Sequence, residues 1–331
     1  MNFKRIYGTE VPPFIQQAAD SKAMLRLKDV GMDCGCEYTS LACWKNLEPY
    51  KRYEHSLAVG MIAYRFSHDE KVALAGVFHD IATPVFAHVI DFMNHDYLQQ
   101  ESTEKGTREI IENDPTIVGL LQEYGLSVDD VCDYHLYPIA DNDSPKLSAD
   151  RLEYTLTNQY RYAKVPLEQV KAFYEDLTVV INEEGEQELA FRDFEIAEAF
   201  TEAMMVTSKV YVQDEDRYSM DLLGQIVKEA VERECLTLED LHTEEQLVIA
   251  KMMSDEVIKE KWLNYRAIDT IEVSDVYREG ALKTNAKKRY INPLVVGKGR
   301  IYDCSTKARQ LIDEFLNKNF DYYVYGYKKG N

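Results

Sequence analysis

The stretch VALAGVFHDIATPVFAHVID (72–91) contains an adjacent His79-Asp80 pair, which is the most informative feature of the chain. Apolar residues repeat at helical spacing between Leu74 and Ile81, which predicts an amphipathic helix with the pair at its C-terminal end. Pro84 then stops or bends that helix, because its ring and missing N–H disrupt the helical backbone. A second helical stretch is expected over 86–93.

Two other stretches complete a set of two imidazoles and two carboxylates, since KRYEHSLAVG (51–60) contains His55 and LSADRLEY (147–154) contains Asp150. Each lies at the edge of a helical pattern, and Ser148 is suited to cap the second helix. A mixed nitrogen and oxygen set suits Mn²⁺, Fe²⁺, Co²⁺, Ni²⁺ or Zn²⁺, with Mg²⁺ also allowed. Alone each residue is ordinary, but the order H…HD…D predicts a metal site made by His55, His79, Asp80 and Asp150.

The composition limits the partners of the protein. Acidic residues number 58 and basic residues 38 among 331, a net charge of −20, so the overall field repels nucleic acid and anionic membranes. A polyanionic substrate must therefore be met by a metal or by a local basic pocket. No apolar signal core is visible before Lys22 and no apolar run is long enough to cross a membrane, which predicts a soluble, cytoplasmic protein. The six cysteines are expected to be reduced thiols.

Helical periodicity dominates the chain, and the predicted fold class is mainly α. We expect a helical, metal-binding core over residues 1–165 and a helical extension with small strands over 166–331, packed together as one globule. The segments 177–181 and 188–191 are expected to pair as a β-hairpin insertion. Helices are expected between residues 193 and 265, and short strands around one further helix should form a small C-terminal α+β appendage.

One segment departs from the acidic average. Between Ala281 and Tyr302 there is no Asp or Glu, but there are six basic residues, Lys283, Lys287, Lys288, Arg289, Lys298 and Arg300. The segment could contact an anion at the active site or at a regulatory site. It could also be a solvated basic strand edge that deters aggregation, and the sequence leaves both interpretations open.

These stretches also carry a resemblance to a known family. The chain resembles the HD-domain metal-dependent phosphohydrolases, and more closely the branch of deoxynucleoside triphosphate triphosphohydrolases. The segments 24–31, 52–57, 79–91 and 150–154 are similar to the family's Q-R-L-x-x-[IL]-x-x-G, R-[FY]-E-H-S-L, H-D-x-G-H-x-P-F-S-H-x-x-[DE] and D-[KR]-x-x-Y. The second half of the chain is similar to the family only in KKRYINPLV (287–295).

The resemblance implies an HD-domain helical bundle and a role for individual residues. The metal ligands would be His55, His79, Asp80 and Asp150. The catalytic residues would be His88, Asp91 and Asp80. The side chains that contact the substrate would be Arg52, Arg151, Tyr154, Glu104 and His135, and guanidinium groups suit phosphate because they bind it in bidentate geometry. The partner would be a small phosphorylated substrate, a nucleotide by resemblance, and the family often assembles into homo-oligomers.

Two family positions differ in this chain. Ala82-Thr83-Pro84 replaces the family's G-H-x, and the segment 103–106 replaces a later H-E-x-G, so two catalytic histidines are missing. A threonine cannot act as a general acid near neutral pH. Either another residue protonates the leaving group, with His95 the nearest spare imidazole, or the leaving group is a good one. These departures weaken triphosphate-specific hydrolysis more than they weaken phosphoester hydrolysis.

The predicted function is a metal-dependent phosphohydrolase that acts on a nucleotide or related phosphoester through a mononuclear site. Two alternatives stay open. A two-metal phosphodiesterase is favoured if His95 or His135 is a ligand. A catalytically weak, nucleotide-sensing HD protein is favoured by the threonines Thr83 and Thr103.

Overall fold

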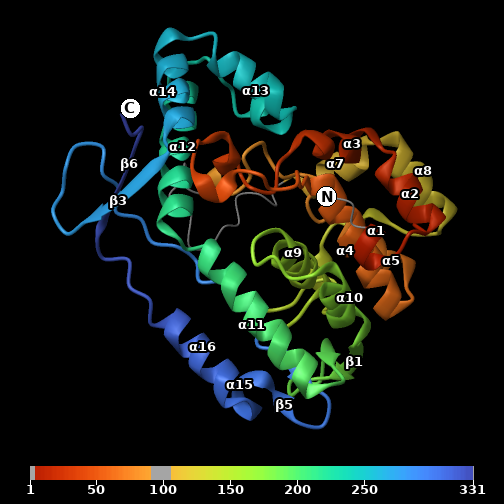
Figure 1. Ribbon diagram of the computed structural model, residues 1–331. Helices are drawn as coiled ribbons and strands as arrows, with labels where there is room; N and C mark the ends of the chain where they lie inside the picture. Colours follow the sequence, from red (N-terminus) through yellow and green to blue (C-terminus); the bar gives the residue numbers. More distant parts are fainter. Residues whose placement is uncertain (1–3, 91–105, 331) are drawn as a thin grey trace.

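The computed structural model describes residues 4–90 and 106–330, and Figure 1 shows how they are arranged. The chain is mainly helical, as predicted. Its α-helices are α1 (Lys4–Tyr7), α2 (Pro13–Ala19), α3 (Lys22–Arg26), α4 (Arg52–Ser67), α5 (Glu70–Phe78), α7 (Thr107–Asn113), α8 (Pro115–Glu123), α9 (Ala149–Arg161), α10 (Leu167–Glu175), α11 (Phe194–Val210), α12 (Asp214–Glu232), α13 (Glu245–Met252), α14 (Glu256–Ala267), α15 (Ile301–Cys304) and α16 (Thr306–Leu316). Within the described ranges no helix is both long and apolar enough to cross a bilayer.

Short 3₁₀ helices lie in the connections between the α-helices. They are η1 (Leu27–Asp29), η2 (Cys36–Tyr38), η3 (Ala42–Trp44), η4 (Val128–Asp130), η5 (Tyr134–Leu136) and η6 (Glu239–His242).

Helices α4 and α5 pack closely because two glycines lie where they cross. A β-carbon at Gly60 would lie 2.3 Å from Val77, and one at Gly76 would lie 3.3 Å from Val59, so larger residues would force the helices apart. From Val72 to Phe78 every side chain of α5 is buried, so α5 is a core helix and not the amphipathic helix expected from its sequence. The close crossing brings the C-terminal end of α5 beside the first turn of α4.

The strands form two small sheets. In the first, β1 (Leu177–Ile181) and β2 (Gln187–Phe191) make the predicted antiparallel hairpin, with Leu177 opposite Phe191. Strand β2 runs parallel to β4 (Leu294–Val295), which pairs antiparallel with β5 (Gly299–Arg300), so the strand order is β1-β2-β4-β5. The second sheet pairs β3 (Thr270–Ser274) with β6 (Tyr323–Tyr327) in antiparallel fashion. The small β elements of the C-terminal half agree with the predicted fold class.

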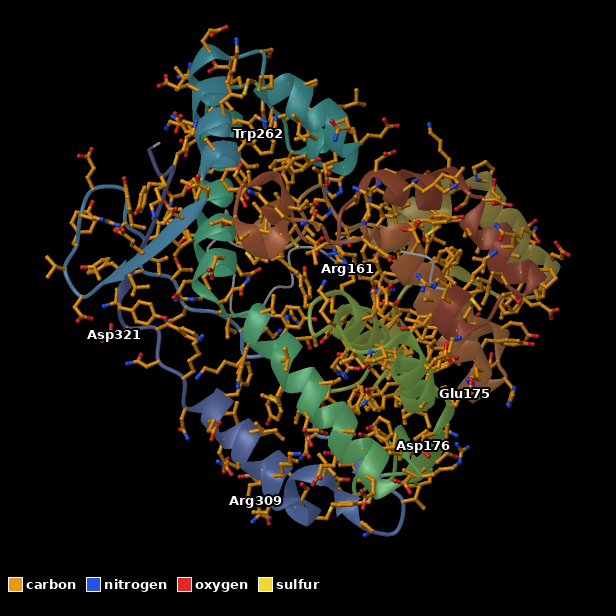
Figure 2. All side chains as sticks on the ribbon, in the orientation of Figure 1. Arg161, Glu175, Asp176, Trp262, Arg309 and Asp321 are labelled. Carbon is orange, nitrogen blue, oxygen red and sulfur yellow. The ribbon has the colours of Figure 1, made fainter. Side chains whose placement is uncertain are left out.

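The buried apolar side chains form two clusters. The larger cluster contains residues of three groups of helices, namely α1–α5, α7–α11, and α15 with α16. The smaller cluster joins residues 85–90 to α12, α13, α14 and β6, and Trp262 of α14 is one of its members (Figure 2). Both clusters contain residues from before and after position 165, and the division of the chain at that position stays a prediction.

The helix expected over 86–93 does not begin at Phe86. Phe86 and Ala87 have φ angles of 63° and 42°, in the left-handed region that a right-handed helix excludes. The Phe86 ring is fully buried and packs against Tyr38 and Trp262, so tertiary packing overrides the helical pattern here. Helical conformation begins at Val89, and the rest of the expected helix lies outside the described residues.

Candidate metal centre

Three helix ends bring the four predicted ligands together. His55 lies in the first turn of α4, His79 follows the last residue of α5 and precedes Asp80, and Asp150 lies in the first turn of α9. Ser148 caps α9, as predicted, because its side chain accepts a backbone N–H of the first turn. The fold therefore places residues that are far apart in the sequence at one point.

The ligand atoms of these side chains converge. One ligand atom each from His55, His79 and Asp80 lies within 4.8 Å of the others. The two Nε2 atoms are 3.2 Å apart, and Asp80 Oδ2 lies 3.4 Å from His79 Nε2. Asp150 Oδ1 lies 3.0 Å from His55 Nε2 and 3.7 Å from His79 Nε2. Atoms that share one ion at about 2.1 Å lie roughly 3 Å apart, so the spacing fits a single divalent ion.

Hydrogen bonds direct the Nε2 atoms of both imidazoles toward this point. His79 Nδ1 donates to the carbonyl oxygen of Gly76 over 2.7 Å. His55 Nδ1 lies 2.5 Å from Glu153 Oε2 and donates to it. With Nδ1 engaged in each ring, Nε2 faces the cluster and is the atom suited to bind a metal. The donor set therefore fits a divalent transition metal.

Asp80 is held as a carboxylate by its neighbours. Burial opposes ionisation of Asp80, but the charges of Arg52 and the two histidines hold its pKa well below the ordinary range. Arg52 Nη1 donates to Oδ2 over 2.6 Å, and the Thr83 hydroxyl donates to Oδ1 over 2.7 Å. Thr83, which stands where the resembled branch has a histidine, thus supports a metal ligand.

His55 and Asp150 form a strongly interacting pair. Burial opposes the charged form of His55, but hydrogen bonds with Asp150 and Glu153 raise its pKa to about 10. Burial also opposes ionisation of Asp150, but the hydrogen bond from His55 and the nearby imidazole charges lower its pKa to about 2. Metal ligands bind in their deprotonated forms, so a metal ion would compete with the His55 proton.

Two residues beside the ligands were not predicted from the sequence. Glu153 contacts His55, and the buried Tyr50 donates its hydroxyl hydrogen to Glu153. Glu153 follows Asp150 by three residues on α9, so the two side chains lie on neighbouring positions of one helix face. That spacing was the available signal for Glu153, whereas Tyr50 precedes α4 and had none.

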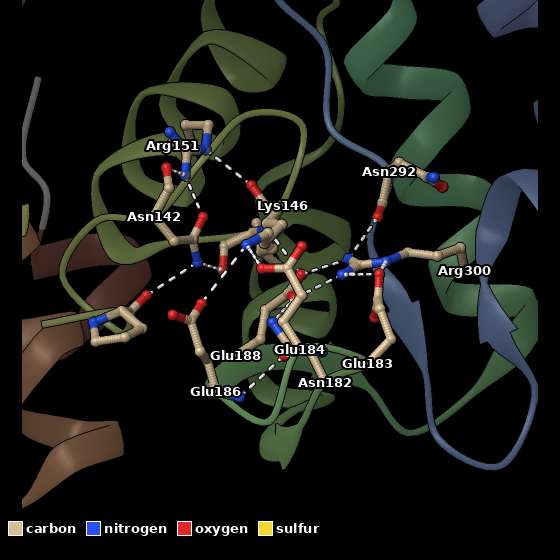
Figure 3. A network of polar contacts seen from close by, with 12 residues as sticks. Asn142, Lys146, Arg151, Asn182, Glu183, Glu184, Glu186, Glu188, Asn292 and Arg300 are labelled. Carbon is tan, nitrogen blue, oxygen red and sulfur yellow. Dashed lines mark hydrogen bonds and ion pairs between the residues drawn. The ribbon is translucent and has the colours of Figure 1, made fainter.

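Arg151 contacts the loop 141–146, as its bonds to Asn142 and Lys146 show (Figure 3). Its Nη1 lies 2.9 Å from Asp141 Oδ1, its Nε donates to the Lys146 carbonyl over 2.8 Å, and its Nη2 donates to Asn142. These contacts hold the loop against the start of α9. The role of Arg151 as a substrate contact stays a prediction.

A cavity of about 280 Å³ opens beside His79. Its wall includes His135, the predicted substrate contact, and Tyr134, which sequence reasoning missed. The Tyr134 ring lies 5.1 Å from the His79 ring and 4.3 Å from the His135 ring. His135 Nδ1 lies 3.0 Å from Asp133 Oδ1 and its Nε2 lies 3.5 Å from Asp141 Oδ2. His135 therefore lies next to the cluster but its nitrogen atoms face other carboxylates.

The remaining predicted residues have different positions. Tyr154 lies one helical turn after Asp150, with its ring 6.2 Å from that of Tyr211. His88 is half-buried in the segment after Pro84. Their roles stay predictions. The other predicted residues of this group, Asp91, Glu104, His95 and Thr103, lie outside the described residues.

Four of the six cations in the basic segment contact other parts of the protein. Arg300 donates to Glu188 over 2.6 and 2.8 Å (Figure 3). Lys288 donates to the carbonyl oxygens of Leu316 and Lys318, the second over 2.7 Å. Lys283 pairs with Asp321, and Lys298 lies 4.5 Å from the centre of the Phe194 ring. For these four, the contacts favour the structural interpretation over an anion site.

Comparison with known proteins identifies the segment that contains the ligands. The HD domain family matches residues 52–152, which include all four predicted ligands. This chain carries an HD domain. The match supports membership of the HD superfamily and agrees with the ligand geometry described above.

Two relatives are similar to the chain over most of its length. The uncharacterized protein YdhJ of Bacillus subtilis is 23% identical over 246 residues, which cover 74% of this chain and 72% of YdhJ. The metal-dependent phosphohydrolase cns2 of Cordyceps militaris is 23% identical over 235 residues, which cover 69% of this chain and 65% of cns2.

Solved structures share the fold of the HD domain and of the rest of the chain. A phosphohydrolase from Bacteroides thetaiotaomicron has a TM-score of 0.63 at 14% identity, with 97% of both chains covered. A hypothetical protein from Aquifex aeolicus has a TM-score of 0.60 at 16% identity, with 96% of this chain and 93% of the other covered. The HD domain, the phosphohydrolases among the similar proteins and the His55, His79 and Asp80 cluster support a metal-dependent phosphohydrolase that uses a divalent ion.

Proposed function

We propose that this protein hydrolyses a small phosphoester, a nucleotide or a related compound, through a mononuclear metal site. The ligands are His55, His79, Asp80 and Asp150. The observation that carries the proposal is the position of His55 Nε2, which lies 3.0 to 3.8 Å from one ligand atom each of His79, Asp80 and Asp150, at the ends of three different helices. Among the described residues no second cluster of this kind is found, which favours one metal over two.

When bound, the metal supplies a Lewis acid for a phosphate oxygen and lowers the pKa of a water molecule. Arg52 keeps the Asp80 carboxylate ionised and in place, through its 2.6 Å contact. Thr83 fixes the other oxygen of the same carboxylate. These two residues hold the ligand in one orientation before the substrate arrives, which reduces the reorganisation needed during the reaction.

Arg52 is also suited to contact the substrate. Its Nε atom is buried and has no hydrogen-bond partner among the described residues. A buried donor without a partner costs about 1–3 kcal/mol, and a phosphate oxygen is an acceptor that could satisfy it. Guanidinium binds phosphate more strongly than a neutral donor does, because the hydrogen bond is assisted by charge. Arg52 is therefore the substrate contact that the structure supports best.

The cavity beside His79 supports a compact substrate. Its volume of about 280 Å³ is close to the lower limit of typical small-molecule sites. Tyr134 offers an aromatic surface there, and the half-exposed His135 offers a polar group. Tyr154, Arg151 and the undescribed Glu104 complete the predicted substrate contacts, with their roles taken from the family resemblance.

The motifs resemble those of the triphosphohydrolase branch, but the leaving-group chemistry favours other substrates. The Thr83 hydroxyl donates its hydrogen bond to Asp80. It therefore occupies the sequence position of the missing histidine but cannot act as the general acid. His88, with Asp91 after it, is the imidazole that matches the family's other catalytic position. We therefore expect phosphomonoesters and short nucleotides to be better substrates than deoxynucleoside triphosphates.

The test is a screen of phosphate and nucleoside release over a panel of nucleotides and phosphomonoesters, with Mn²⁺, Co²⁺, Ni²⁺ and Mg²⁺. Metal-dependent turnover that is lost in His79→Ala supports the proposal. Two metal ions per chain together with phosphodiester cleavage would favour the phosphodiesterase instead. Nucleotide binding without turnover under any metal would favour the sensor and would overturn the proposed hydrolase.

A further inference from the structure

We propose that Glu153 is a positioning residue of the metal centre, which fixes the ring of His55 and strengthens its bond to the metal. The inference deepens the proposed function and rests on the same metal site. The hydrogen bonds that the structure describes for Glu153 reach His55, Tyr50, Thr157 and Tyr7, so its effect would act through His55. Its role is therefore defined by the hydrogen bonds that it makes with its neighbours.

Glu153 is completely buried on α9, although it is a carboxyl side chain. Burial of an ionisable group is costly unless other groups compensate for the lost water. Its Oε2 lies 2.5 Å from His55 Nδ1, on the side of the ring opposite the ligand atom Nε2. The Glu153 carboxylate therefore contacts one nitrogen of the imidazole, and the other nitrogen faces the metal position. Carboxylates in this arrangement orient metal-binding histidines.

The remaining hydrogen-bond capacity of Glu153 is filled by hydroxyl groups. Tyr50 donates to the same Oε2 atom, and Thr157 donates to Oε1 over 2.8 Å. Tyr7 of α1 donates to the Glu153 backbone carbonyl over 3.2 Å. His55, Tyr50 and Thr157 therefore donate to one buried carboxyl group and leave it little freedom to rotate, while Tyr7 holds the backbone beside it. That restriction is transmitted to the ring of His55.

The hydrogen bond selects the form of imidazole that a metal needs. Acceptance of the Nδ1 hydrogen by Glu153 leaves Nε2 as the nitrogen that faces the other ligands. The carboxylate also makes the imidazole a more basic ligand. Without Glu153, the His55 ring could rotate or could carry its hydrogen on Nε2, and both changes would weaken the metal bond.

The experiment measures Co²⁺ binding, by calorimetric titration and by the visible absorption of the bound ion, in the full chain after metal removal. Loss of such an outer carboxylate typically weakens metal binding about 10- to 100-fold. We expect Glu153→Ala to reach that range and to alter the Co²⁺ absorption spectrum. Glu153→Gln should be closer to wild type, about tenfold weaker, because its amide can still accept the Nδ1 hydrogen.

Asp114→Asn is the matched control. Asp114 is another buried carboxyl group, but it caps α8 and accepts from Ala23, away from the ligands. Its variant should bind Co²⁺ within about twofold of wild type, since no ligand loses a neighbour. If Glu153→Ala fails to fold, Glu153→Gln decides alone, because glutamine can satisfy the same three partners.

Co²⁺ affinities of the Glu153 variants equal to wild type, with an unchanged spectrum, would overturn the inference. The binding assay separates this result from the proposed function. A wild-type protein that binds Co²⁺ but hydrolyses nothing would refute the hydrolase while leaving the role of Glu153 intact. If wild type hydrolyses its substrate and Glu153→Ala binds Co²⁺ as tightly as wild type, the hydrolase stands and the role of Glu153 is refuted.

Discussion

The guanidinium of Arg52 donates to Asp80 Oδ2 over 2.6 Å, and both side chains are almost completely removed from solvent. The contact joins the first residue of α4 to a metal ligand at the end of α5. The guanidinium of Arg52 therefore holds Asp80 in place and is also the proposed contact to the substrate phosphate.

Replacing Arg52 by alanine should lower kcat/KM about 30- to 1000-fold, because one charge-assisted contact in a shielded site contributes about 2–4 kcal/mol to transition-state stabilisation. Steady-state kinetics with the best substrate of the panel would measure the loss. Arg151→Ala is the comparison, since its loop contacts predict lower thermal stability with a smaller kinetic effect. Equal kinetic losses in both variants would place Arg151 at the substrate after all.

The protein should contain transition metal at up to one ion per chain when purified, because its two imidazoles favour such ions over Mg²⁺. Elemental analysis of wild type and of a His79→Ala, Asp80→Ala double variant would test this. The variant should lose the metal, and treatment of wild type with a chelator should lower its melting temperature, since a bound ligand stabilises the folded state. His68→Asn changes an exposed histidine and should keep the metal. The same metal content in all three proteins would contradict the site.

Leaving-group ability should control the rate of hydrolysis. Loss of a general acid costs about 10²–10⁴-fold for a poor leaving group and much less for a good one. We therefore expect p-nitrophenyl phosphate to be hydrolysed much faster than phenyl phosphate, and dGTP to release little intact triphosphate. Colorimetric phosphate release and chromatography of the nucleotide products would measure both. Efficient conversion of dGTP to deoxyguanosine and triphosphate would show that His88 or another imidazole supplies the proton.

The stability of the fold should decrease between pH 5 and 8 because of Glu37. Burial, with the charges of Asp33 and Glu245, raises the pKa of Glu37 from its ordinary 4.5 to about 8. Between these values the unfolded chain releases a proton that the folded chain keeps, so the contribution of Glu37 to the free energy of unfolding falls as the pH rises, and this fall is complete above pH 8. Urea unfolding at pH 5, 6.5 and 8 should show this slope in wild type.

Glu37→Gln removes that titration and should reduce the slope, so the variant gains stability relative to wild type as the pH increases. The gain is expected because glutamine carries no charge, whereas the carboxylate of wild type ionises in a buried site where its Oε2 has no hydrogen-bond partner among the described residues. Glu260→Gln changes an exposed carboxylate and should preserve the slope of wild type. Parallel curves for wild type and Glu37→Gln would show that Glu37 titrates normally in the folded protein.

The sequence was sufficient to predict the helical fold class, the hairpin over β1 and β2, and the meeting of the histidines with Asp80. These features depend on neighbouring residues in the sequence, because the spacing of apolar residues indicates helices and short apolar runs indicate strands. The ligands followed from their types and from their positions at the ends of helical patterns. The HD domain over residues 52–152 confirms the superfamily that the motifs indicated.

The features that escaped prediction depend on contacts between distant segments. The spacing from Asp150 places Glu153 on the helix face of that residue, but its burial depends on the packing of Tyr50 and Tyr7. Phe86 belongs to a helical pattern, but its ring is drawn into a core that α14 completes. The contacts of Arg151 with Asp141 were not foreseen either, and its role as a substrate contact stays a prediction.

The burial of Phe86 against Trp262 also limits how far the protein can be shortened for expression. Phe86 follows Asp80 by only six residues, and its ring is covered by Trp262 of α14. A fragment that ends near residue 165 would retain every predicted metal ligand and lose this cover. The ring, with Val85 and Val89, would then face water beside the predicted metal site, and such apolar surface promotes aggregation. A usable minimal fragment must therefore extend at least through α14.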